Sequence, residues 1–212
     1  MVLRTREEMR MIREGNIIAT ARCYEPGCGG TMEGRKGEYK YTECGLNSVT
    51  LKGVLVFHCT KCNAIVPDIP AAGVLHRVIA MKLLIKETLL TGSELRFLRK
   101  LCGYSVTEFS EIMGSPNKSV IYRWETQSTH GKDTDRIVRL LVTGKLIREL
   151  TGTPDPILHN VNAAQLLLDI EQNLKLIQPR RVDEEYEISP EEIARFRGVP
   201  ETEPAIQELA VQ

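Results

Sequence analysis

Between residues 91 and 125, apolar residues recur every three or four positions in three short runs. This spacing predicts three short amphipathic helices, because residues three and four apart lie on one face of a helix. Thr91 with Glu94, and Ser105 with Glu108, have capping-box spacing and predict where the first two helices begin. Asn117 can cap the third helix. The apolar faces comprise Leu95, Leu98 and Leu101; Val106, Phe109, Ile112 and Met113; and Val120, Ile121 and Trp124.

The third run also carries polar residues near its start, on the side of the helix opposite to the apolar face. Two helices joined by a glycine-containing turn, the second with polar side chains near its N-terminus, form the helix-turn-helix arrangement that fits the major groove of DNA. Such side chains can hydrogen-bond base edges or phosphates. The pattern favours a DNA-binding unit, with an ordinary small helical bundle as the alternative. The candidate DNA-binding residues are Asn117, Lys118, Ser119, Tyr122 and Arg123.

Residues 71–90, before this segment, carry apolar side chains around more than one face. A helix of that kind needs partners on two sides. We therefore expect a connector helix that packs both on the helix-turn-helix unit and on a second copy of the chain. His76 and Arg77 fall on its polar side and are expected to be solvated.

The segment after the third helix predicts a loop and a closing helix. In the loop 127–132, Lys132 or His130 can contact DNA phosphates. Residues 133–150 predict a helix that meets its twin in a homodimer, which places two DNA-contacting helices one DNA turn (~34 Å) apart. The residues expected to face inward are Ile137, Leu140, Leu141, Leu146 and Ile147.

The C-terminal part of the chain is acidic. After a linker, 151–156, and an amphipathic helix predicted over 163–177, residues 183–212 contain nine acidic and two basic residues and carry a charge of −7. The whole chain has 28 basic and 28 acidic residues, so residues 1–182 carry +7. A basic body suits a nucleic-acid partner, and a proline-containing acidic tail is expected to be disordered or to fold only on binding.

Five of the six cysteines lie between residues 23 and 62. Cys23 and Cys28 are separated by four residues, and Cys59 and Cys62 by two, which is the spacing of two metal-binding clips. Strand-like segments at 38–44 and 48–59 separate the clips and predict a small zinc ribbon that depends on the metal for its folding free energy. Four thiolates leave no coordination position for a catalytic water. The predicted Zn²⁺ is therefore structural. The sequence shows no paired carboxylates, phosphate loop or nucleophile–base arrangement, so no enzyme is expected.

Two further residues compete as metal ligands. Cys44 lies outside both clips, and we expect it to be a small buried side chain. His58 precedes Cys59, and adjacent side chains in a strand point to opposite faces of the sheet. We therefore expect His58 outside the site as well.

No apolar run approaches the roughly 18 residues of a membrane span. The first 22 residues are charged throughout and do not resemble a signal peptide. These features predict a cytoplasmic protein without a membrane partner, in which cysteines bind metal more often than they form disulfides.

The stretch LTGSELRFLRKLCGYSVTEFSEIMG, followed by SVIYRWE, resembles the Cro/C1-type (Xre-type) helix-turn-helix family. One departure is Val106, where that family often has a phosphate-contacting glutamine. In combination with CGGTM and CTKC, residues 23–150 resemble the YgiT/MqsA-type antitoxins. The first clip departs from that family by its four intervening residues, where two are usual.

The resemblance implies a role for several residues and partners. It implies that Cys23, Cys28, Cys59 and Cys62 bind zinc and that Arg123 contacts a base. Ser119 takes the place of a base-contacting asparagine, a role that Asn117 or Lys118 can fill if the register differs by one. It also implies that the ribbon docks a toxin protein while the helix-turn-helix represses its operon as a dimer.

The sequence thus predicts a mainly α protein with a small β zinc ribbon and a C-terminal helical or disordered tail. Its expected function is that of a sequence-specific repressor that binds double-stranded DNA, the antitoxin of a type II toxin-antitoxin module. The alternatives are a stand-alone phage- or plasmid-type regulator and a toxin-neutralising protein whose helix-turn-helix mainly dimerises. The expected regions are an extension (1–22), the zinc ribbon (23–70), the connector (71–90), the helix-turn-helix domain (91–150), a linker with a helix (151–182) and the acidic tail (183–212).

Overall fold

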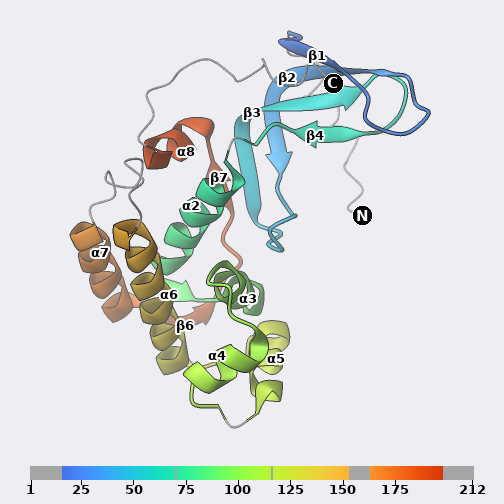
Figure 1. Cartoon of the computed structure of the whole chain (residues 1–212). Helices are drawn as coiled ribbons and strands as arrows, with labels where there is room; N and C mark the ends of the chain where they lie inside the picture. The colour runs from blue at the N-terminus through green and yellow to red at the C-terminus, as the bar shows by residue number, and fades with distance from the viewer. Residues whose placement is uncertain (1–15, 70, 116, 153–162, 198–212) are drawn as a thin grey trace.

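The structure, a computed structural model, describes residues 16–69, 71–115, 117–152 and 163–197. A five-stranded sheet lies at one end of the molecule and most of the helices lie at the other (Figure 1). No helix of the described ranges is long and apolar enough to span a membrane. A mainly helical chain with a small sheet beside the cysteines confirms the predicted fold class at this level, and β5 (Thr88–Leu89) and β6 (Gln178–Arg181) form a further two-stranded sheet. The helices are α2 (Ala72–Leu84), α3 (Gly92–Leu101), α4 (Val106–Ile112), α5 (Lys118–Gln127), α6 (Lys132–Gly152), α7 (Ala163–Leu176) and α8 (Pro190–Arg197).

The sheet has the antiparallel order β1-β2-β3-β4, and a short C-terminal strand, β7, pairs with β3 in parallel. The strands are β1 (Ala19–Arg22), β2 (Thr31–Lys40), β3 (Val49–Cys59), β4 (Ile65–Pro67) and β7 (Tyr186–Ile188). The prediction of a strand over 48–59 is confirmed. The prediction over 38–44 is confirmed for 38–40 and wrong for 41–44, because β2 ends at Lys40 and the chain then turns through Gly45 (φ 85°). Gly34 and Gly37 lie inside β2, and because glycine is uncommon in strands, the residue pattern did not indicate most of this strand.

The three helices predicted between residues 91 and 125 are present with the expected starts. Thr91 with Glu94 and Ser105 with Glu108 form complete capping boxes at α3 and α4. The Asn117 side chain accepts a hydrogen bond from the backbone N–H of Ser119 at 2.8 Å and caps α5. These local hydrogen bonds satisfy N–H groups that the first turn of a helix leaves free.

The connector helix α2 is covered on both sides within one chain. Its buried face packs on the sheet and α3, and α8 covers its other side, where Lys82 Nζ lies 2.8 Å from Glu192 Oε1. Much of the apolar surface of α2 is thus covered within one chain, and its contact with a second copy stays a prediction. His76 is half-buried rather than fully solvated: its Nε2 lies 2.8 Å from Tyr41 Oη, and its ring meets the edge of Phe97. Burial lowers the pKa of His76.

The closing helix α6 buries only part of the face that we predicted: Leu146 is buried and Leu141 packs against the core, as expected. Ile137 and Leu140, expected inward, are each 52% exposed. Arg139 is fully buried instead, because its guanidinium binds Asp135 Oδ1 at 2.7 Å and donates to the carbonyl oxygens of Leu84, Lys86 and Thr88. Polar residues with internal partners can occupy a core face, which the apolar pattern alone does not predict.

The expected disordered tail is wrong for residues 186–197. After α7, β6 (Gln178–Arg181) pairs in parallel with β5 (Thr88–Leu89), β7 joins the sheet and α8 packs on α2. Tyr186, Ile188 and Ile193 are buried in the common core. Residues 198–212, and the first 15 residues of the expected extension, lie outside the described ranges.

Candidate metal centre and candidate nucleic-acid interface

The four clip cysteines meet at one end of the sheet. Cys23 follows β1, Cys28 lies in the loop before β2, Cys59 ends β3 and Cys62 lies in the turn before β4. Because β2 pairs with both β1 and β3, the strand register brings the two clips together. Their four Sγ atoms lie within 4.8 Å of one another.

The sulfur positions fit one tetrahedrally bound metal ion. Cys23 Sγ lies 3.7 Å from Cys62 Sγ, and Cys28 Sγ lies 3.6 Å from Cys59 Sγ. A tetrahedral ion with Zn–S bonds of about 2.3 Å requires sulfur–sulfur distances of about 3.8 Å. All four cysteines are free thiols, with no disulfide among them. The predicted ligand set is therefore brought together in a geometry that suits a metal.

Cys44 and His58 do not belong to this group. Cys44 packs against the core, and its thiol donates to the backbone oxygen of Tyr41 at 3.4 Å. His58 lies one residue before Cys59 on β3, where alternation turns its side chain away from the sulfurs. Both placements agree with the prediction that neither residue replaces a clip cysteine.

Backbone N–H groups favour negative charge at the cluster. Those of Cys62 and Lys61 each approach Cys59 Sγ at 3.4 Å and lower the pKa of Cys59 to about 6. Although the Ala64 N–H lowers the pKa of Cys62, desolvation and the three neighbouring thiols raise it to about 12. Without a cation, the first thiol of the cluster thus ionises easily, and the last thiol ionises only at high pH. A bound cation removes this repulsion.

Gly30 is required by the close packing of the cluster. A Cβ atom at this position would lie 2.6 Å from Cys59 Sγ and 3.2 Å from Cys28 Sγ. Gly30 also accepts a backbone hydrogen bond from Cys23 at 2.9 Å, so it fixes the first clip. The sequence indicated a glycine-rich turn here but not which glycine must lie against the sulfurs.

The candidate DNA-binding residues share the exposed side of α5. All five side chains predicted from the sequence are exposed, whereas Ile121 on the opposite side is buried and Val120 and Trp124 are partly buried. The inner and outer faces of this helix are therefore the predicted ones. The exposed set is Asn117, Lys118, Ser119, Tyr122 and Arg123.

A buried ion pair fixes α5 to α3. Arg99 donates from Nε to Glu125 Oε1 at 2.5 Å and from Nη2 to Oε2 at 3.1 Å, and it also donates to the Tyr104 carbonyl oxygen. Gly92 lets the two helices approach, because a Cβ there would lie 2.4 Å from the Glu125 carbonyl oxygen. Glu125 therefore has a structural role in this unit. Arg99 was missed, since no pattern distinguishes it from exposed Lys100 beside it.

The two loop residues considered as phosphate contacts differ in exposure. His130 is 2% exposed, and its Nε2 lies 3.6 Å from Asp135 Oδ2. It is therefore enclosed by the protein and is not a surface contact. Lys132 is half-buried at the start of α6 and remains a candidate.

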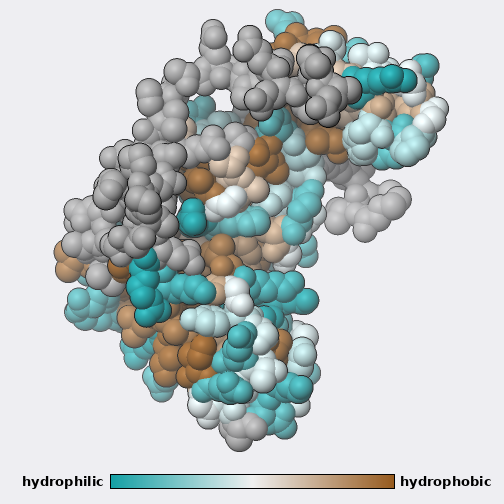
Figure 2. All heavy atoms as spheres, viewed as in Figure 1, coloured by the Kyte–Doolittle hydropathy of each residue, from teal (hydrophilic) through white to brown (hydrophobic). Residues whose placement is uncertain are grey.

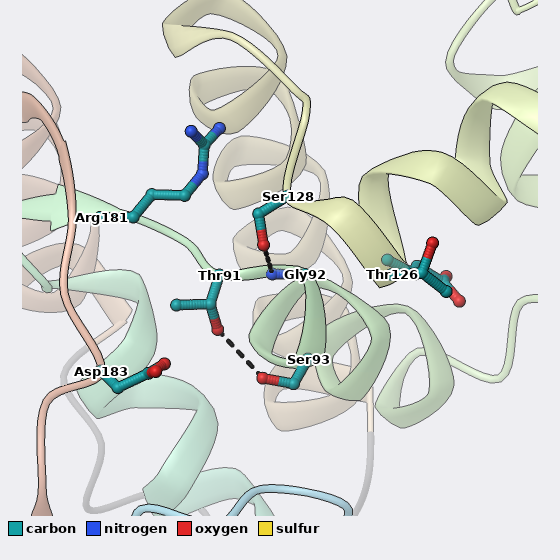
Figure 3. A pocket seen from close by; sticks show the side chains of 8 residues that line it. Thr91, Gly92, Ser93, Thr126, Ser128, Arg181 and Asp183 are labelled. Carbon is teal, nitrogen blue, oxygen red and sulfur yellow. Dashed lines mark hydrogen bonds between the residues drawn. The ribbon is translucent and has the colours of Figure 1, made fainter.

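An open pocket of about 430 Å³ lies between the start of α3, the end of α5 and β6 (Figure 3). Its hydroxyl groups are used locally: Ser128 Oγ accepts from the Gly92 N–H at 2.7 Å, and Thr91 Oγ1 lies 3.0 Å from Ser93 Oγ. Arg181 donates to the carbonyl oxygens of Leu90 and His130. Of the two carboxylates in its lining, Glu125 is paired with Arg99 and belongs to the contact between α3 and α5.

A scan against protein-family models and searches of curated proteins and of solved structures each found no match to this chain. No family is therefore shown, and the functional argument depends on the geometry of the two sites.

Proposed function

We propose that this protein is a sequence-specific DNA-binding repressor with a structural zinc site. The observation that carries the proposal is the exposed polar side of α5, held rigidly by a buried ion pair. The helix follows α4 after a short turn, which is the order of a helix-turn-helix unit. A rigid helix with exposed hydrogen-bonding side chains near its N-terminus suits readout of base edges in the major groove.

Within this proposal the exposed residues of α5 have different tasks. Arg123 can donate two parallel hydrogen bonds to a guanine edge, and Ser119 or Asn117 can contact a neighbouring base or phosphate. Lys118 supplies charge near the N-terminus of the helix, and Tyr122 offers both a hydroxyl group and an apolar ring. Because Asn117 caps the helix through its side-chain oxygen, its side-chain NH₂ remains available as a donor.

Zinc is the metal that four thiolates at these distances fit best. Cys23, Cys28, Cys59 and Cys62 would hold it with no position left for a water. The ion would offset half of the charge of the four thiolates and join the ends of β1 and β3 through the two turns that carry the clips.

The antitoxin role is a proposal that rests on the resemblance of residues 23–150 to YgiT/MqsA-type antitoxins. The sheet end that carries the cysteines is the surface proposed to dock a toxin protein. We expect to find an adjacent gene whose expression arrests growth unless this chain is present. Its absence would favour a stand-alone regulator, while the DNA-binding proposal would be unaffected.

The DNA-binding proposal predicts that two basic residues contribute differently. On DNA from the protein's own upstream region, Arg123→Ala should cost about 1–3 kcal/mol of binding free energy and remove preference at one base pair. Lys132→Ala should weaken binding to all sequences by a similar small amount, because a phosphate contact carries no base preference. Fluorescence anisotropy on a series of single-base-pair substitutions measures both effects.

Lys175→Ala is the control, since this exposed lysine lies on α7 and pairs with Glu171 at 3.1 Å. Its affinity for DNA should equal that of the wild-type protein. Equal affinity for Arg123→Ala and the wild type on every sequence would contradict the proposed role of α5.

A further inference from the structure

The four clip cysteines lie where a small molecule in solution can reach them. Cys28, Cys59 and Cys62 are only partly buried, and of the four Cys23 alone is buried, at 8% exposure. Most of β1, beside them, is exposed. Figure 2 shows the cysteine end of the sheet as the lobe at the upper right, with hydrophilic and hydrophobic side chains mixed on its visible surface. Thiolates in such a position are accessible to soluble oxidants.

The two other cysteines of the chain are in a different environment. Cys102 is 2% exposed in the core, and the Cys44 thiol donates to the backbone oxygen of Tyr41 at 3.4 Å. Burial raises the pKa of Cys44, which keeps it a thiol at neutral pH. Because oxidants react with thiolates rather than with thiols, we expect oxidation to be confined to the clip cysteines.

Two of the sulfur–sulfur contacts run between the clips. Cys28 Sγ lies 3.6 Å from Cys59 Sγ, and Cys23 Sγ lies 3.7 Å from Cys62 Sγ. A disulfide bond is about 2.05 Å long, so each pair has to close by roughly 1.6 Å. The register of β2 with β1 and β3 already holds the two clips side by side. These pairs are therefore placed to form bonds while the strands keep their register.

We propose that the four clip cysteines are a site of reversible oxidation by hydroperoxides, including hydrogen peroxide. Cys28 bonds to Cys59, and Cys23 bonds to Cys62, so that two disulfides between the clips take the place of the metal. They join the same two turns that the ion would join, and the cysteine end of the sheet stays folded after zinc has left. Disulfides within each clip would instead leave the two turns unconnected.

Each disulfide consumes one hydroperoxide. A thiolate attacks a peroxide oxygen, the O–O bond breaks, and the sulfur becomes a sulfenic acid while the released alkoxide or hydroxide takes up a proton. The facing thiolate then attacks the sulfenic sulfur, the S–O bond breaks, and the departing hydroxide takes up a proton to become water. The two sulfurs lose two electrons, which the peroxide gains. A dithiol reductant reverses the bond by thiol–disulfide exchange.

The release of zinc rests on the proposed metal site, whereas the disulfides form from the cysteines with or without an ion. Measuring the bound zinc before oxidation separates the two. A chain that binds no zinc and still forms the disulfides between the clips would contradict the metal proposal alone. A chain that binds zinc and keeps four free thiols in excess peroxide would contradict the oxidation site alone.

The test maps the disulfides of the full-length, zinc-loaded chain after treatment with hydrogen peroxide. Free thiols are blocked with a maleimide, and the chain is digested with trypsin without reduction. Trypsin leaves both cysteines of the first clip in the peptide 23–35 and divides the second clip between the peptides 53–61 and 62–77. Mass spectrometry should find all three peptides joined in one species, and fragmentation should assign Cys28 to Cys59. A peptide 23–35 closed on itself, beside 53–61 joined only to 62–77, would overturn the proposal.

Two further measurements show whether the disulfides replace the metal. A chromophoric chelator should detect one zinc ion released for every two disulfides formed. Hydrogen exchange should show residues 19–32 and 57–67 at least about 30-fold better protected in the oxidised chain than in the chelated, reduced chain, because a disulfide stabilises the segment that it closes. Equal protection in these two forms would overturn the proposal, since the turns would then not be joined.

Variants of single cysteines test the pairing. Cys44→Ser is the control, because Cys44 lies outside the group, and its disulfide map and zinc release should equal those of the wild type. In Cys28→Ser, Cys23 should still join Cys62 as the main product, and Cys59 should remain without a disulfide partner. A bond between Cys59 and Cys62 as the main product of this variant would contradict pairing between the clips.

Discussion

The two ends of the five-stranded sheet are stabilised in different ways. At the end near α2, Val49, Leu51, Val54 and Val56 are at most 2% exposed and share one core with the helices. At the cysteine end, most of β1 is exposed and β4 is only partly buried. The sheet that we expected to depend wholly on a metal is thus supported by apolar packing at one end. The difference teaches that a bound metal would stabilise the sheet most at the end that the core does not reach.

The C-terminal segment strengthens the packed end. Lys86 Nζ, 2.9 Å from both carboxylate oxygens of Glu94, also donates to the backbone oxygen of Val182 at 2.6 Å. Tyr186, beside β3, donates to the same carboxylate at 3.3 Å. The sheet, the start of α3 and the C-terminal segment are therefore joined through buried charges that satisfy one another.

The largest effect that separates the two ends should come from metal removal. Chelation should lower the opening free energy of amides in residues 19–32 and 57–67 by about 5 kcal/mol or more, since a structural thiolate site contributes that much or more to local folding. Amides of residues 49–54 should keep their protection. Hydrogen exchange with and without chelator measures the protection of both sets of amides. Equal loss of protection along all of β3 would contradict the division of the sheet into a metal-dependent end and a core-supported end.

A smaller effect, spread over the whole molecule, should come from Arg139→Met. Asp135, fully buried, would lose its guanidinium partner, which should cost about 3–5 kcal/mol of unfolding free energy. The bound metal content before unfolding should not change, because the cysteines lie at the far end of the sheet. Urea unfolding and metal analysis test this pair of outcomes.

Arg136→Met is the matched control for Arg139 on the same helix. Arg136 is partly exposed and lies 3.8 Å from the exposed Asp133, so its loss should cost less than about 1 kcal/mol. If both variants lost the same unfolding free energy, the buried pair Asp135–Arg139 would add nothing to the stability of the packed end.

The smallest effect should come from Gly30→Ala. The added methyl group would press on Cys59 and Cys28, which should weaken zinc affinity by about 10- to 100-fold, as changes around metal ligands commonly do. Competition with a chromophoric chelator measures the affinity. Gly73→Ala is the control, because a Cβ there meets no atom within 4 Å. Unchanged affinity in Gly30→Ala would mean that the first clip is more adaptable than its packing indicates.

The features that the sequence predicted well are those encoded by neighbouring residues. The caps Thr91, Ser105 and Asn117 act within four residues, and the cysteine clips are fixed by tight turns. The features that it did not predict depend on partners far along the chain. Arg139 is buried because carbonyl groups some fifty residues away accept from it, and nothing near it in sequence shows this.

The C-terminal strand illustrates the same limit. Tyr186 and Ile188 lie among acidic residues, so their composition favoured a disordered tail. The edge of β3 and the Glu94 carboxylate, both far away in sequence, provide the partners that order them. Short segments of this kind become predictable only when the surface that receives them is known.

The most direct test of the central claim is selection of bound DNA from a random pool by the zinc-loaded protein. If the exposed side of α5 contacts bases, the selected sequences should converge on one motif, and selection with Arg123→Ala should lose preference at a single position of that motif. Selected DNA with no motif, or the same complete motif with both proteins, would contradict the proposed role of α5.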